Sequence, residues 1–166
     1  MSLISALANV HHQGQFGDFE DKKGDDLLKI SEKKNLLIVQ IVQFKNSSIP
    51  IESIDIDGLK LKDSSLNVAF NENTRILWNG PKNWLLVSSK KDLIKKISLT
   101  CKETDFAVTD LSHSRAAIEI EGNYVLEVLK KGSPFNFDIL KKNNSINSLY
   151  NNIAFTVDLL NDKPFK

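Results

Sequence analysis

The sequence predicts one α+β domain with ferredoxin-like connectivity. From Trp84 onward, the expected elements follow the order strand, helix, strand, strand, helix, strand, which is the split βαβ order of ferredoxin-like folds. The chain has 166 residues, enough for one domain that buries roughly 70% of its unfolded surface and short for two. Hydrophobic residues make up 41% and charged residues 26% of the chain, as in ordinary globular proteins. We therefore expect a single α+β domain over residues 34–166.

The N-terminal segment 1–33 is expected to be an arm that is flexible or bound to a partner. It contains three glycines and a cluster of charges, without sustained periodicity. The domain starts near Asn35, because the β-branched run over 35–44 predicts a strand. The isoleucines of 49–63 fit either a strand or a short helix begun by Pro50, so this stretch stays undecided.

The middle of the chain predicts a hairpin. Two short apolar strands are expected at 75–78 and 84–88, and the turn between them contains Gly80 and Pro81. These earlier strands must join or extend the sheet that the later strands form, in an order that sequence leaves open.

Two short amphipathic helices are expected. Ser89 is a candidate N-cap for a helix over 90–97, and Asn123 for a helix over 124–131 that ends at a glycine followed by a proline.

Three further strands complete the prediction. Strands are expected at 106–112 and 114–121, and these two are expected to pair. In 114–121, Ala116, Ile118 and Ile120 alternate with other residues, which predicts one buried face. The last strand is expected at 151–160.

The segment 109–115 is the most concentrated set of reactive side chains. Asp110, Ser112, His113 and Arg115 supply an acid, a hydroxyl, an imidazole and a guanidinium. However, neighbouring side chains of a strand point to opposite faces, and the sequence has no GxSxG nucleophile elbow. A structural role is therefore expected, in which Asp110 or Ser112 bonds to the backbone at the bend between two strands.

Other candidate sites have weaker support. His11 and His12 are adjacent and lack a third ligand at suitable spacing, and the single cysteine, Cys101, excludes a CxxC zinc site. The sequence also lacks a phosphate-binding glycine motif. Trp78 and Trp84 flank the hairpin turn, where they either stack on a flat ligand or, more commonly, pack across the hairpin.

Charge and cysteine usage restrict the class of protein. The chain has 22 basic and 21 acidic residues, for a net charge of +1, which argues against nucleic acid as the main partner. Its two arginines are Arg75 and Arg115. The sequence has no secretory signal and no apolar run long enough to span a membrane, so a cytoplasmic protein is expected.

Two longer segments carry a family resemblance. RILWNGPKNWLLVSS (75–89), followed by AVTDLSHSRAAIEIEGNYVLEVLKKGSPFNFDI (107–139), resembles the gamma subunit of heterotetrameric sarcosine oxidase. We expect structural or interface roles for the positions that carry this motif, namely Trp78, Gly80, Pro81, Trp84, Asp110, Ser112, His113, Arg115, Gly122, Gly132 and Asp138.

The resemblance implies a fold similar to the folate-binding region of the glycine-cleavage aminomethyltransferase. It also implies a non-catalytic assembly role in a complex that oxidatively demethylates sarcosine to glycine, with tetrahydrofolate accepting the one-carbon unit and oxygen accepting electrons. The alpha, beta and delta subunits are then the expected partners, and FAD, FMN, NAD, zinc and tetrahydrofolate are expected in those subunits. The isolated chain could self-associate through surface that serves the other subunits.

Two alternatives stay open: a stand-alone folate or pterin binder in which Trp78 or Trp84 stacks on the ring, and an unrelated interaction module.

Members of the family usually continue with a further strand and a C-terminal helix. We therefore expect that the chain, which ends at DKPFK, lacks these two elements.

Overall fold

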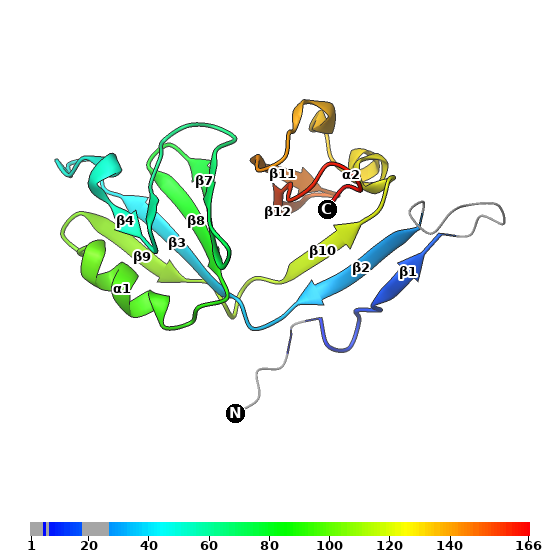
Figure 1. Cartoon of the computed structure of the whole chain (residues 1–166), viewed down its shortest axis with the longest axis horizontal. Coiled ribbons are helices and arrows are strands. Elements are labelled where there is room, and N and C mark those ends of the chain that lie inside the picture. The colour runs from blue at the N-terminus through cyan, green and yellow to red at the C-terminus, as the bar shows by residue number, and fades with distance from the viewer. Residues whose placement is uncertain (1–4, 6, 18–26) are drawn as a thin grey trace. The chain divides into compact units, whose positions relative to one another are not determined.

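A computed structural model describes residues 5, 7–17 and 27–166 (Figure 1). Contacts divide the chain into two units. Residues 35–115 form the central unit, and residues 1–34 together with 116–166 form the terminal unit. This division differs from the single domain over 34–166 that the sequence predicts.

The central unit is built on a five-stranded antiparallel sheet. Its strand order is β6-β7-β8-β3-β9, so the expected strand near Asn35 lies between two strands that come later in the chain. The predicted hairpin is confirmed as β7 and β8, with Trp78 opposite Trp84. The strands are β3 (Leu37–Gln43), β6 (Val68–Phe70), β7 (Thr74–Gly80), β8 (Asn83–Ser88) and β9 (Phe106–Asp110).

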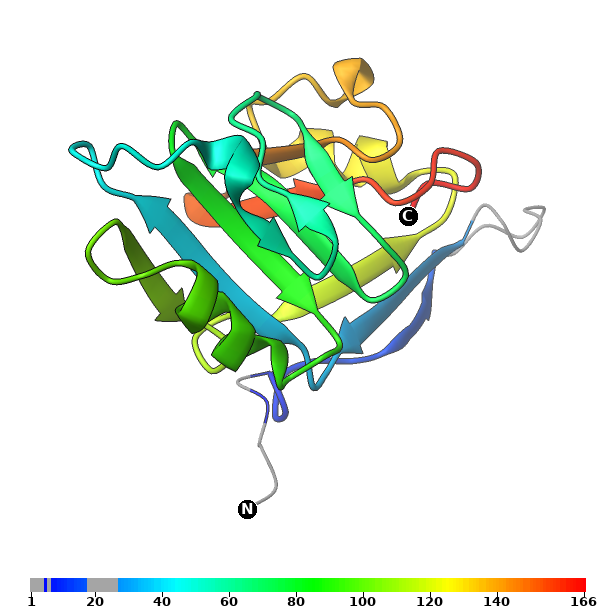
Figure 2. The same ribbon diagram turned by 60° about the vertical axis from the view of Figure 1, so that its left-hand side comes forward.

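One face of this sheet holds the core of the central unit. Alternate residues of the strands point to this face, because side chains alternate along a strand. The helix α1 (Leu93–Thr100) and the strand pair β4 (Asp55–Ile56) and β5 (Leu59–Lys60) cover it (Figure 2). The core residues with at most 1% exposure are Val39, Ile41, Ile56, Leu61, Trp84, Leu86 and Ile97.

The undecided stretch 49–63 contains both kinds of element. A 3-10 turn, η2 (Ile51–Ser53), follows Pro50, and the short strands β4 and β5 follow η2. The isoleucines therefore serve two local structures in turn, which explains why no single periodicity fits them.

The terminal unit contains two smaller sheets and α2 (Val125–Gly132). β1 (Gly14–Phe16), β2 (Leu28–Lys33) and β10 (Ala117–Glu121) form one sheet with β2 in the middle. The other sheet is the hairpin of β11 (Ser145–Tyr150) and β12 (Ile153–Asp158). The helix α2 ends at Gly132, as predicted, and the 3-10 turn η3 (Phe137–Ile139) follows.

The terminal unit also corrects the prediction for the first 33 residues. No regular element was expected there, whereas β2 pairs along its length with β10, and β1 pairs with β2. The charged residues of β2 hide its strand character in the sequence, because its stability comes from backbone pairing with residues about ninety positions away.

The expected pairing of the strands at 106–112 and 114–121 is wrong. β9 pairs with β3, and β10 pairs with β2 in the other unit. The order of elements after Trp84 is present, but its strands are divided among three sheets, so the pairing does not confirm the ferredoxin-like arrangement within the α+β class.

Three local predictions are also corrected. Asp92 and Tyr124 occupy the N-cap positions of α1 and α2, in place of the predicted Ser89 and Asn123. Ser89 instead donates a hydrogen bond to the side chain of Asn73. Ile118, expected on a buried face, is 50% exposed. Among the described residues, no helix is long and apolar enough to cross a membrane.

Candidate functional site

The DLSHSR segment forms a hydrogen-bonded turn at the end of β9. The backbone N–H of Ser112 and its hydroxyl both donate to Asp110 Oδ1, over 2.9 and 2.6 Å. The Ser112 hydroxyl in turn accepts a hydrogen bond of 3.0 Å from the buried N–H of Ile38 in β3. The bond from the Ser112 N–H to Asp110 is the backbone contact at the bend that the sequence predicts, whereas the contact of Ser112 with Ile38 in β3 was not predicted.

The turn is not arranged as a nucleophile with its base. The hydroxyl proton of Ser112 points to Asp110, and this hydrogen bond is the main cause that lowers the pKa of the Asp110 carboxyl below its usual value. His113 and Arg115 are exposed, and neither hydrogen-bonds to Ser112 within the part of the chain that the structure describes. The segment therefore brings Asp110 and Ser112 together and leaves His113 and Arg115 on the surface.

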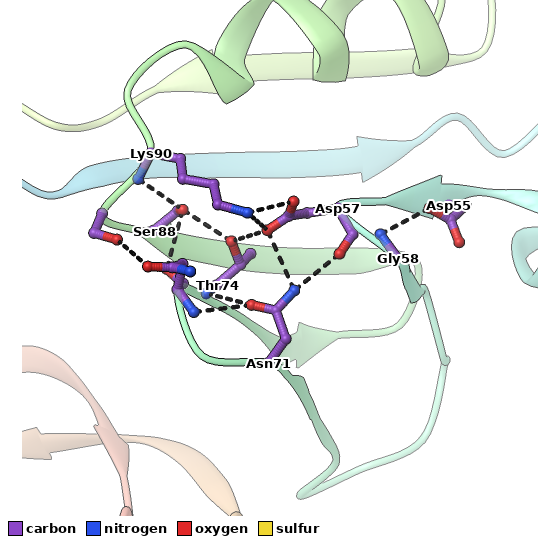
Figure 3. Close-up of polar contacts among 9 residues, drawn as sticks. Asp55, Asp57, Gly58, Asn71, Thr74, Ser88 and Lys90 are labelled. Carbon is purple, nitrogen blue, oxygen red and sulfur yellow. Dashed lines mark hydrogen bonds and ion pairs between the residues drawn. The ribbon is translucent and has the colours of Figure 1, made fainter.

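A second polar cluster, which the sequence did not predict, surrounds Asp57 (Figure 3). Lys90 Nζ lies 2.8 and 3.0 Å from the two carboxylate oxygens of Asp57. The Thr74 hydroxyl donates to Asp57 Oδ2 over 2.7 Å, and the Asn71 amide donates to the same oxygen and to the Asp57 carbonyl. Ser88 Oγ lies 2.9 Å from Thr74 Oγ1, and both residues are buried. We call these five residues the Asp57 cluster.

The Asp57 cluster connects three separate segments of the central unit, around Asp57, 71–74 and 88–90. Asp57 follows β4 in the left-handed conformation, with φ of 58°. Asn71 lies between β6 and β7, Thr74 begins β7, and Ser88 and Lys90 come at and after the end of β8. These positions are up to 33 residues apart, so no short motif could have indicated them.

The electrostatics of the Asp57 cluster favour an ion pair over a reactive group. The hydrogen bond from Lys90, followed by that from Thr74, lowers the pKa of Asp57 to about 2. Asp57 therefore stays ionised and holds the Lys90 ammonium, while Ser88 Oγ accepts from the Lys90 backbone N–H and lies 3.1 Å from the Asn73 carbonyl. Since these groups are occupied by one another, we interpret the cluster as structural.

The two tryptophans anchor the segment before β6 to the hairpin. Trp84 is 1% exposed, and its indole N–H donates to the Lys62 carbonyl over 2.8 Å. The indole N–H of Trp78 donates to Asp63 Oδ1 over 2.7 Å, and Asp63 Oδ2 accepts from the backbone N–H of Lys82. Burial leaves no face of the Trp84 ring open for a flat ligand.

Pro81 lies in the hairpin turn, as predicted, whereas Gly80 is the last residue of β7 and not part of the turn. The register shifts between Trp78 and Gly80, and Gly80 has a φ of 147°, which side chains rarely adopt. Gly80 pairs with Asn83, so Pro81 and Lys82 form the turn.

The remaining motif positions contribute to packing in the terminal unit. A Cβ on Gly122 would lie 2.5 Å from the Leu27 carbonyl oxygen, and a Cβ on Gly132 would lie 2.5 Å from the Tyr150 ring. Asp138 pairs with Lys130 of α2 over 2.8 Å. The two glycines therefore mark close approaches of the chain, where no side chain fits.

No group of three potential metal ligands occurs among the described residues, His11 and His12 included. Cys101 is buried, and its burial raises the pKa of the thiol to about 11, so the thiol stays protonated at neutral pH.

Comparisons with known proteins identify the fold. No family model and no curated protein matches this sequence. A chain in the solved structure of heterotetrameric sarcosine oxidase from Corynebacterium sp. U-96, in complex with pyrrole 2-carboxylate, matches with a TM-score of 0.75. The two chains are 20% identical, and the match covers 84% of this chain and 74% of that chain. At this identity the likeness shows a shared fold.

Proposed function

We propose that this chain is a non-catalytic, gamma-type subunit of a sarcosine-oxidase-like complex. The observation that carries the proposal is the shared fold with a chain of a heterotetrameric sarcosine oxidase, at a TM-score of 0.75 over 84% of this chain. The sequence motif at 75–89 and 107–139 supports the same assignment independently.

The roles of the motif residues favour assembly over catalysis. Ser112 holds the backbone of β3, Trp84 fills the core, and Gly132 allows the Tyr150 ring to approach α2. Residues that maintain a fold in this way are expected in a subunit that acts through the surface it offers to other subunits and not through a reaction centre.

In the proposed complex, the chemistry belongs to other subunits. The complex would oxidise the N-methyl group of sarcosine and release glycine, with tetrahydrofolate accepting the one-carbon unit and oxygen the electrons. FAD, FMN, NAD, zinc and tetrahydrofolate would be held by alpha, beta and delta subunits, and this chain would stabilise their assembly.

Co-expression tests this proposal. The full chain would be produced together with candidate flavoprotein subunits of a sarcosine oxidase, and the products would be analysed by size-exclusion chromatography, flavin absorbance and sarcosine-dependent oxygen consumption. We expect this chain to co-elute with the flavoprotein and to raise the yield of active complex. Equal assembly and activity without the chain would contradict the proposal.

A parallel titration distinguishes an assembly role from folate binding. Because Trp84 is buried and the indole N–H of Trp78 is bonded to Asp63, we expect tetrahydrofolate to leave the tryptophan fluorescence of the isolated chain unchanged. Saturable quenching, lost in Trp78→Phe, would favour a stand-alone folate or pterin binder.

A further inference from the structure

The outer face of α1 combines positive charge with an exposed leucine. Leu93 and Ile97 are buried in the core of the central unit, so the opposite side of this helix faces outward. Lys95 and Leu99 are four residues apart on that side, and Lys96 lies three residues before Leu99, so the three side chains are neighbours on the helix surface. Leu99 is 79% exposed, more than any other large hydrophobic residue among those described.

The lysines of this face carry positive charge that is not neutralised by ion pairs with acidic side chains among the described residues. Lys91, Lys95 and Lys96 are all exposed, and none forms an ion pair within the described ranges. Asp92 is the single acidic residue between positions 90 and 102. Lys90 forms an ion pair with Asp57, and the charge of Lys102 lowers the pKa of Asp105. These two lysines therefore add less unbalanced positive charge than Lys91, Lys95 and Lys96 do.

This concentration of charge is local. The whole chain has a net charge of only +1, so the lysines of α1 are not part of a generally basic surface. Charges on such a face act within about 8 Å at physiological ionic strength, which is the distance over which a docked partner feels them.

We infer that the outer face of α1, formed by Lys95, Lys96 and Leu99, together with Lys91 just before the helix, docks an acidic polypeptide segment that carries an apolar side chain. Carboxylates of the partner would pair with the lysines, and its apolar side chain would cover Leu99 and exclude water from it. The inference stands on these four residues and does not depend on the proposed function.

Two other anionic partners fit this face less well. Nucleic-acid binding draws on many phosphate contacts, often from arginine, and this chain has two arginines, neither of them on α1. An interfacial membrane helix needs a broad apolar face, whereas α1 has eight residues and buries Leu93 and Ile97 in the core.

A peptide titration of the full, isotope-labelled chain tests the inference by NMR. The probe is the peptide EELEELEE, and the comparison peptides are KKLKKLKK and EEGEEGEE. We expect EELEELEE to shift the amide signals of residues 91–102, with affinity falling as salt rises. We expect KKLKKLKK not to bind, and EEGEEGEE to bind more weakly because it cannot cover Leu99.

Matched charge reversals locate the binding. Lys95→Glu with Lys96→Glu is expected to weaken binding of EELEELEE about tenfold or more, because like charges then face each other. Lys141→Glu with Lys142→Glu reverses a lysine pair of the terminal unit that is also exposed, and it is expected to leave affinity within about twofold. Leu99→Ser, which keeps all the lysines, provides a second variant should the double reversal fold poorly, and it is expected to remove the preference for EELEELEE over EEGEEGEE.

Three results would overturn the inference. The first is an equal loss of affinity in the Lys141 and Lys142 variant, which would mean that binding follows overall charge. The second is a set of shifted signals outside 91–102. The third is tighter binding of duplex DNA or of phosphatidylserine vesicles than of EELEELEE in the same buffer.

Discussion

The hydroxyl of Ser112 replaces a backbone acceptor at the point where β9 stops pairing with β3. The last paired position is Asp110 opposite Val39, and Ile38 then donates its N–H to Ser112 Oγ instead of to a strand carbonyl. Asp110 fixes that hydroxyl by accepting from it and from the Ser112 N–H. One serine thus satisfies a buried donor that the end of the strand would otherwise leave unpaired.

Replacing Ser112 by alanine tests this role. Ser112→Ala is expected to lower the free energy of unfolding by about 1–3 kcal/mol, because the N–H of Ile38 stays buried without an acceptor. Ser114→Ala serves as the control, since its hydroxyl bonds to the Leu111 carbonyl on an exposed part of the turn. Chemical denaturation measures both variants, and equal free energies for the two would contradict the assigned role.

The Asp57 cluster makes stability depend on pH in the acid range. The folded pKa of Asp57 is about 2, below the value of about 3.9 for an unfolded aspartate. A lowered folded pKa stabilises the native state above the unfolded value, and that contribution is lost as pH falls through the folded value. The Asp57 contribution is therefore complete at neutral pH and disappears between about pH 4 and pH 2.

Asp57→Asn removes this contribution. The variant is expected to lose about 1–3 kcal/mol of unfolding free energy at pH 7, because the ammonium of Lys90 and the buried hydroxyl of Thr74 lose a charged partner. The difference from the parent protein should shrink when unfolding is measured at pH 2–3. Glu52→Gln, at an exposed acid of the central unit, is expected to have little effect at either pH. A difference that stays constant with pH would contradict the ion pair.

At the scale of elements, the glycine that ends α2 also sets how closely the helix approaches the β11–β12 hairpin. The Tyr150 ring lies where a Cβ on Gly132 would be, and the backbone N–H of Asn151 donates to the Gly132 carbonyl over 2.8 Å. Ser133 and Ser148 join their hydroxyls at 2.8 Å beside this contact. The Tyr150 hydroxyl also donates to the Val128 carbonyl of α2 over 3.4 Å, so one close approach and three polar contacts join the helix end to the hairpin.

A double-mutant comparison tests that approach. Gly132→Ala is expected to destabilise the protein by about 1–3 kcal/mol, because the new methyl group overlaps the Tyr150 ring. In the background of Tyr150→Leu, the same change is expected to be neutral or to stabilise by up to about 1 kcal/mol, since alanine is the better helix former. Equal effects in both backgrounds, measured by thermal unfolding, would show that the ring is not the obstacle.

The strand expected at 151–160 is present as β12, whereas β11 is not predicted, although the turn between the two strands is indicated in the sequence. Asn151 and Asn152 have φ values of 46° and 68°, and they link Tyr150 to Ile153, which face each other across the hairpin. Asparagine adopts positive φ more readily than most residues, so a pair of asparagines between apolar residues is a two-residue hairpin signal. The sequence therefore contains a signal for a strand that ends at Tyr150, which is β11.

At the scale of the whole molecule, the chain forms two units and passes from one to the other twice. It leaves the terminal unit between Lys34 and Asn35 and returns between Arg115 and Ala116. The motif residues Asp110, Ser112 and Arg115 lie just before the return. The motif segment 107–139 therefore contains the position at which the chain returns from the central unit to the terminal unit.

Arg115 tests the proposed assembly role at this scale. It is exposed and forms no hydrogen bond or ion pair with the described residues, so Arg115→Lys should change the unfolding free energy by less than about 0.5 kcal/mol. We expect the same variant to reduce the yield of the co-expressed complex, because a lysine cannot reproduce the planar, forked donors of arginine. Lys141→Arg is the control and should leave the yield unchanged. Full assembly with Arg115→Lys would argue against an interface at this residue.

Elements with local signals could be predicted from the amino-acid order alone. The β-branched run predicted β3, turn residues predicted the β7–β8 hairpin, and apolar periodicity predicted two short helices. The bond between Asp110 and the Ser112 N–H was also predictable, because the two residues are two positions apart, whereas the contact of Ser112 with Ile38 spans 74 positions. Such signals depend on a few neighbouring residues, which is the range over which backbone preferences and side-chain periodicity act.

The pairing of the strands and the meeting of distant polar groups became known from the folded structure. β10 pairs with β2 instead of β9, and Asp57 meets Lys90 across 33 positions of the chain. A strand's residues specify which face is buried but not which edge is its neighbour, because backbone hydrogen bonds are the same for every partner. Which strand becomes the neighbour depends on the entropy of closing long loops and on the packing of the core, and both are properties of the whole chain.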